Sequence, residues 1–127
     1  MLLPEPYELI DLHDGNSITL QVESWLDGSM KIHPQTVSKR HLRIHMDQRG
    51  LTEPPPVGTP IDVEIPMIRL VGKRLDAPHG SPWWDATSKT LRADLLARFT
   101  SGLPLPATIR LTANGHKPHK RYSVEVL

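Results

Sequence analysis

The sequence predicts a mainly β protein with one α-helix, folded as a single domain over residues 1–127. Apolar and polar residues alternate strictly over Ser17–Glu23 and in several later segments. A period of two is typical of a strand with one buried face. Proline accounts for 13 residues, which disfavours a helical bundle because proline removes a backbone donor and clashes with the preceding turn. Residues 88–99 instead place apolar side chains at helical spacing.

The N-terminal region is predicted to form a hairpin. Asp14-Gly15-Asn16 supplies the Asp-Gly chemistry that tight hairpin turns prefer. It separates the alternating segment 17–23 from an extended segment, Tyr7–His13. These two segments are therefore expected to be the first pair of strands.

Further strands are predicted in the middle of the chain. In His41–Asp47, three apolar residues lie on one face and His, Arg and Asp side chains lie on the other. A second alternating run covers residues 61–65, and an extended piece covers 68–71. Pro66 separates them and predicts an edge strand or a bulge, because proline cannot donate to a ladder.

A helix over about 88–99 is predicted from one apolar stripe, formed by Leu91, Leu95, Leu96 and Phe99. Thr87 or Ser88 can cap its first turn through a side-chain hydroxyl, and Gly102 suits a left-handed cap after its last turn. Two alternating segments follow, 108–112 and 122–126. An Asn-Gly turn signal lies between them, which predicts a terminal hairpin.

This order of elements suits a β-barrel or roll, in particular a small OB-like Greek key with a helix before its last two strands. A β-sandwich or another α+β roll remains an alternative, and the extended pieces over 61–71 depart from the OB pattern. The Pro-rich residues 50–60 are predicted to be a loop inside one domain. The alternative, a linker, would leave about 50 residues on one side, which is marginal for independent stability.

The composition excludes several classes of site and of protein. The chain has no cysteine, which excludes disulfides, thiolate metal sites and cysteine nucleophiles. No apolar run approaches the roughly 20 residues of a membrane span, and the first residues lack the pattern of a signal peptide. We therefore expect a cytoplasmic protein with no membrane contact and no cofactor.

Positive charge gathers in two places although the formal net charge is only +1. One basic cluster comprises Lys31, Lys39, Arg40, Arg43 and Arg49, and the other comprises Lys117, Lys120 and Arg121. In an OB-like barrel, the loop of the terminal hairpin and the face of strands 2 and 3 line the same binding surface. We therefore predict phosphate contacts from Lys39, Arg40, Arg43, Lys117, Lys120 and Arg121. The alternative is an ordinary solvated surface, which the small net charge favours.

Aromatic side chains are the other candidates for binding. Trp25 and Trp84 are predicted to stack on bases, as aromatic residues do in proteins that bind single strands. The alternative for Trp83 and Trp84 is a place in the core, with one ring buried and its neighbour exposed. An exposed tryptophan would suit a protein partner equally well.

The sequence contains no established catalytic motif. His41 with His45, and His116 with His119, are close pairs, but two imidazoles alone make a weak metal site. We therefore predict no metal site and no catalytic residue. Asp11 and Asp14 flank His13, yet such spacing arises from alternation alone.

The sequence thus favours a small OB-like module that binds nucleic acid, either single-stranded DNA or RNA, alone or as part of a larger complex. The alternative is a protein-interaction or assembly subunit, using the proline loop, an exposed tryptophan pair or exposed strand edges for docking or self-association. A hydrolase or metal enzyme is the third alternative.

Overall fold

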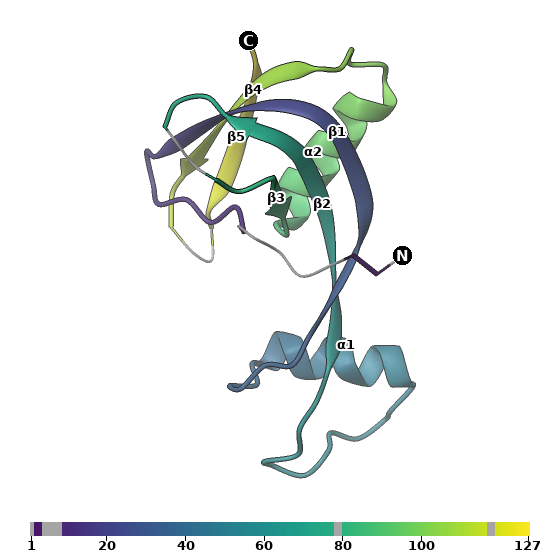
Figure 1. The fold of residues 1–127 in the computed structure, drawn as a ribbon. Coiled ribbons are helices and arrows are strands. Elements are labelled where there is room, and N and C mark those ends of the chain that lie inside the picture. Colours follow the sequence, from purple (N-terminus) through teal and green to yellow (C-terminus); the bar gives the residue numbers. More distant parts are fainter. Residues whose placement is uncertain (1, 4–8, 78–79, 117–118) are drawn as a thin grey trace.

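The computed structural model describes residues 2–3, 9–77, 80–116 and 119–127. It contains five antiparallel strands and two helices (Figure 1). In chain order these elements are β1 (Ser17–Ile32), α1 (Lys39–Arg49), β2 (Val63–Arg74), β3 (Trp83–Ala86), α2 (Lys89–Thr100), β4 (Ala107–Asn114) and β5 (Arg121–Val126). The fold is therefore α+β. No helix in the described part of the chain is long and apolar enough to cross a membrane.

The strands form one sheet in the order β3-β2-β1-β4-β5. The edge strands β3 and β5 do not pair with each other within the described residues, so the sheet is open and the predicted barrel closure is absent there. The predicted terminal hairpin is confirmed, since β4 pairs with β5 from Asn114↔Arg121 to Ile109↔Val126.

β1 and β2 are longer than the rest of the sheet. β4 pairs with β1 only as far as Val22, and β3 pairs with β2 only from Ile68 onward. Beyond those points β1 and β2 continue as a two-stranded ribbon that leads away from the sheet to α1 (Figure 1). Pro66 lies in this ribbon opposite Ser29, where β2 has no second strand beside it. Its position therefore agrees with the predicted edge.

The main core lies between the sheet and α2. Leu91, Leu95 and Phe99 of α2 are buried, which confirms the predicted apolar stripe. Ser88 caps the helix by accepting a hydrogen bond from Leu91 N. The stripe packs against the sheet residues Ile18, Leu20, Val22, Ile68, Leu70, Trp84, Ala86, Ile109 and Leu111.

The strand predicted over His41–Asp47 is wrong, because these residues form most of α1. Ser38 accepts a hydrogen bond from His41 N, and His41 Nδ1 accepts one from Ser38 N, so the two residues cap the helix reciprocally. Gly50 ends the helix with φ of 64°. The caps at Ser38 and Gly50 thus favour a helix here, although the alternating pattern of the segment is typical of a strand.

The N-terminal strand predicted over Tyr7–His13 is also not found in its described part. Residues 10–13 hold no strand, and Leu9 forms only an isolated bridge with Asp85 of β3. Tyr7 lies outside the described residues. The Asp14-Gly15 turn is present, with Gly15 at φ of 82°, but it leads into β1 beside β4 and joins no hairpin.

Candidate functional site

One surface cavity brings together a cation from each of the two basic clusters. Arg40, at the start of α1, and Lys120, just before β5, both line a cavity of about 260 Å³. Its remaining lining residues are Leu9, Ile10, Asp11, Thr87, Ser88 and Tyr122. We call it the Arg40 cavity. It lies where the β1–β2 connection, the β4–β5 connection and the start of α2 meet.

Lys120 is held firmly at this cavity. Its ammonium donates to Asp11 Oδ1 and to the carbonyl of Leu12, both at 2.7 Å, and it lies 5.8 Å from the centre of the Tyr122 ring. The hydrogen bond with Asp11 raises the pKa of Lys120 above its ordinary value. Lys120 therefore remains charged at neutral pH and ties residues 11–12 to the start of β5.

Two guanidinium groups lie near each other beside the cavity. Arg92 of α2 is half-buried, and its Nε donates to the carbonyl of Thr87 at 3.4 Å. Burial lowers the pKa of Arg92, and the positive charge of the exposed Arg40 lowers it further, whereas Asp27 raises it. An anion between the two guanidinium groups would relieve their repulsion. Sequence reasoning missed Arg92 because it belongs to neither basic cluster.

The start of α2 adds partial positive charge to the same place. Ser88 is the N-cap, and the first turn carries no acidic residue that would neutralise the free backbone N–H groups. Asp11 in the same lining pairs with Lys120, so Arg40 and this helix end are the groups that can offer positive charge to an anion in the Arg40 cavity.

The other predicted phosphate contacts lie outside this cavity. Lys39 and Arg43 line a neighbouring groove on the exposed side of α1, together with Leu42, Met46, Asp47 and Leu51. Arg121 is exposed and, by strand alternation, lies on the opposite side of β5 from Tyr122. Lys117 lies outside the described residues.

The predicted stacking role of Trp84 is not supported. Trp84 is only 4% exposed and belongs to the main core, so it offers no ring face to a base. Trp83 and Trp84 lie in strand β3, where Trp83 is half-buried under the guanidinium of Arg69 at 4.5 Å. The exposed tryptophan pair expected for docking is therefore not present. Trp25 is half-buried and stacks on Phe99, with ring centroids 5.3 Å apart.

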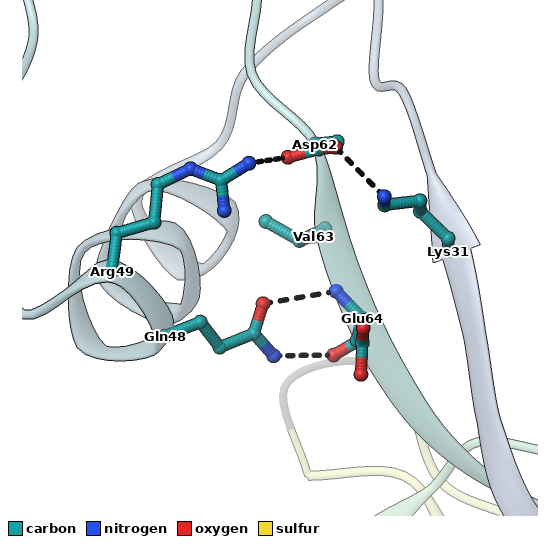
Figure 2. A pocket seen from close by; sticks show the side chains of 6 residues that line it. All are labelled: Lys31, Gln48, Arg49, Asp62, Val63 and Glu64. Carbon is teal, nitrogen blue, oxygen red and sulfur yellow. Dashed lines mark hydrogen bonds and ion pairs between the residues drawn. The ribbon is translucent and has the colours of Figure 1, made fainter. Parts of the chain in front are cut away.

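A second cavity lies between α1 and the ribbon, and the residues that line it connect the two elements (Figure 2). The side-chain amide of Gln48 accepts from Glu64 N at 3.1 Å and donates to the Glu64 carbonyl at 3.0 Å, as a neighbouring strand would. Arg49 and Lys31 both pair with Asp62. The buried His45 donates from Nδ1 to the carbonyl of Asp62 at 2.9 Å. These polar groups satisfy one another and fix α1 on β2.

The ion pairs of Asp62 make the stability of this connection between α1 and the ribbon depend on pH. Desolvation raises the pKa of Asp62, but the hydrogen bond from Lys31 and the charge of Arg49 outweigh it and hold the pKa below 3.8. The stabilisation from Asp62 is therefore complete above pH 3.8 and is lost as pH falls below that value. We expect Asp62→Asn to be less stable than wild type near neutral pH, with a difference that shrinks in acid.

Urea unfolding across the acid range measures this effect. Glu53→Gln, which removes one carboxylate from the exposed loop after α1, is the control. A difference between wild type and Asp62→Asn that stays constant with pH would contradict the assignment.

Among the described residues, no group of three or more His, Asp or Glu side chains is placed to hold a metal ion. Comparison of the chain with family models, with curated proteins and with solved structures gave no significant match.

Proposed function

We propose that this protein binds single-stranded nucleic acid through the sugar-phosphate backbone, with the Arg40 cavity as the centre of the binding surface. The observation that carries the proposal is that Arg40 and Lys120 line one cavity although they lie on connections far apart in the sequence. Lys39 and Arg43 extend the positive charge along the exposed side of α1. Such a strip is suited to following a polyanionic backbone.

The strand order supports this proposal. The order β3-β2-β1-β4-β5, with a helix between β3 and β4, matches an OB-like Greek key left open between β3 and β5. We propose that the fold is of this type, with α1 inserted between β1 and β2. In OB folds, the loops after strands 1 and 4 bind oligonucleotides, and here these connections carry the two basic clusters.

A single strand suits the site better than a duplex. A cavity of about 260 Å³ has room for a phosphate and part of its nucleotide, but not for two paired strands. Trp25 is half-buried with one face on Phe99, so stacking on Trp25 would add to affinity only at its exposed part. Phosphate contacts are therefore expected to dominate, and affinity should depend strongly on salt.

Fluorescence anisotropy with a labelled single-stranded oligonucleotide tests the proposal at two salt concentrations. We expect Arg40→Gln to weaken binding about tenfold at low salt, as the loss of one charge-assisted contact predicts. We also expect it to reduce the slope of log affinity against log salt by about 0.7, the value for one phosphate contact on a single strand.

Arg110→Gln is the matched control. Arg110 is exposed on the side of β4 away from the buried Ile109, and it pairs with Glu125 at 3.1 Å. Arg110→Gln therefore removes one positive charge, as Arg40→Gln does, but from the other side of the sheet. The proposal is overturned if wild type does not bind at low salt, if salt has no effect, or if the two variants bind equally.

A further inference from the structure

The Arg40 cavity adjoins another cavity, which is lined by two histidines. This neighbour, of about 250 Å³, is lined by Asp11, His13, Asp14, Gly115, His116 and Lys120. It shares Asp11 and Lys120 with the Arg40 cavity, so both lie against the same ammonium. We call it the two-histidine cavity. Its imidazoles come from opposite ends of the chain, one before β1 and one after β4.

Local hydrogen bonds hold the two histidine-bearing segments together. The carboxylate of Asp14, beside His13 in the chain, accepts a hydrogen bond from Gly115 N at 2.7 Å. His116 therefore follows directly after a backbone group anchored to the turn that carries His13. Gly115 adopts φ of 85°, and the carbonyl of His116 accepts from His119 N at 2.8 Å, which closes the loop.

The side chains at this cavity are two imidazoles, the carboxylates of Asp11 and Asp14, and the ammonium of Lys120. His116 Nε2 lies 3.9 Å from Asp14 Oδ2, which is an ion pair when the ring is protonated. The structure gives His13 no such partner among the described residues. Lys120 lies at the junction of the two cavities, with its ammonium paired to Asp11 Oδ1 at 2.7 Å. A proton acceptor, a proton donor and a cation beside a bound phosphate are the parts that phosphodiester cleavage requires.

We propose that the two-histidine cavity cleaves single-stranded RNA without a metal ion, with His13 as general base and His116 as general acid. This activity rests on the proposed nucleic-acid binding, because the Arg40 cavity would hold the neighbouring phosphate. The substrate class is RNA, since the reaction uses a ribose 2′-hydroxyl as its nucleophile.

The reaction balances without any other reactant. His13 removes the proton of the 2′-hydroxyl, and the 2′-oxygen forms a bond to the adjacent phosphorus. The bond between phosphorus and the 5′-oxygen of the next nucleotide breaks. His116 in its protonated form gives its proton to that leaving oxygen, and Lys120 stabilises the negative charge on the phosphorus group. The products are a 2′,3′-cyclic phosphate and a free 5′-hydroxyl.

The test incubates the full chain, in a metal chelator, with labelled single-stranded RNA and with DNA of the same sequence. We expect RNA fragments that end in a 2′,3′-cyclic phosphate, identified by mass, and intact DNA. His13→Gln and His116→Gln should each slow cleavage by about 10²- to 10⁴-fold, the usual contribution of a general acid or base. His119→Gln is the control from the same loop, because His119 does not line the cavity.

Binding of 2′-O-methyl RNA, which lacks the nucleophile, separates this inference from the proposed function. If that RNA binds and unmodified RNA stays intact, the cleavage inference is overturned and the binding function stands. If that RNA does not bind, both are overturned. Cleavage that is equally fast in His13→Gln, His116→Gln and wild type would come from a contaminating nuclease and would also overturn the inference.

Discussion

Asp85→Asn is expected to lower the free energy of unfolding by about 3–5 kcal/mol, the usual cost of breaking a buried ion pair from one side. Arg69 and Asp85 are 2% and 0% exposed, and their side chains are joined by hydrogen bonds of 2.8 and 2.9 Å. The substitution keeps the shape of the side chain but removes its charge. The buried Arg69 guanidinium, stacked over Trp83, would then lose the carboxylate that holds it through two hydrogen bonds.

Chemical denaturation of Asp85→Asn and of a matched exposed variant checks this expectation. Glu125→Gln removes one partner of the Arg110–Glu125 pair, whose side chains are 44% and 61% exposed, and it should cost less than about 1 kcal/mol. We expect the double variant Arg69→Met with Asp85→Leu to be more stable than Asp85→Asn, because it removes both charges of the buried pair together. Equal effects of Asp85→Asn and Glu125→Gln would contradict this account.

Gly72→Ala is expected to be the other strongly destabilising change. A Cβ at Gly72 would lie 1.8 Å from the carbonyl oxygen of Gln21, which is backbone of the adjacent strand and cannot rotate away. The clash falls beside the register shift between Val22 and Ser24, where the pairing of β1 with β4 ends. The two strands would have to separate there, so we expect a loss at or above the upper end of the 1–3 kcal/mol range typical of overpacking.

Gly80→Ala provides the matched control, because a Cβ at Gly80 meets no atom within 4 Å. Both variants replace glycine by alanine, so they share the change in unfolded-chain entropy. Thermal and urea unfolding should place Gly80→Ala near wild type. Similar unfolding midpoints for the two variants would show that the β1–β2 pairing accommodates the added methyl group.

Much of the sheet and α2 could be predicted because their local patterns agree with their tertiary environment. Alternation over Ser17–Glu23 marks the part of β1 that lies between β2 and β4. The rest of β1 could not be recognised, since Asp27-Gly28 resembles a turn and this part of β1 lies beyond its pairing with β4. The stripe in α2 was recognisable because Leu91, Leu95 and Phe99 all face one core.

α1 shows why a short alternating pattern is ambiguous. Its buried residue is His45, a polar side chain, while Leu42 remains half-buried and Arg43 is exposed. Ile44 packs against the buried cluster of β2, whereas Leu42 and Met46 line a surface groove, so the apolar residues do not mark a single buried side of the helix. Ser38 and Gly50 were the better signals, because a hydroxyl before and a glycine after an eleven-residue segment are typical helix caps.

The candidate site was predictable in its residue types but not in its geometry. The sequence marks Arg40 and Lys120 as members of basic clusters, but only the strand order brings their connections to one cavity. Arg92 was missed because its position depends on how α2 packs. The roles of Trp83 and Trp84 depend on the orientation of β3, which a four-residue strand does not reveal in its pattern.

The position of β1 at the centre of the sheet has a consequence for biosynthesis. β1 leaves the ribosome before every other strand, yet one of its two neighbours, β4, begins only at Ala107. A nascent chain that has just completed β2 therefore exposes the β4 side of its earliest strand. Formation of the complete sheet must wait until β4 and β5 have been translated, so native structure is expected to arise late and through contacts distant in sequence.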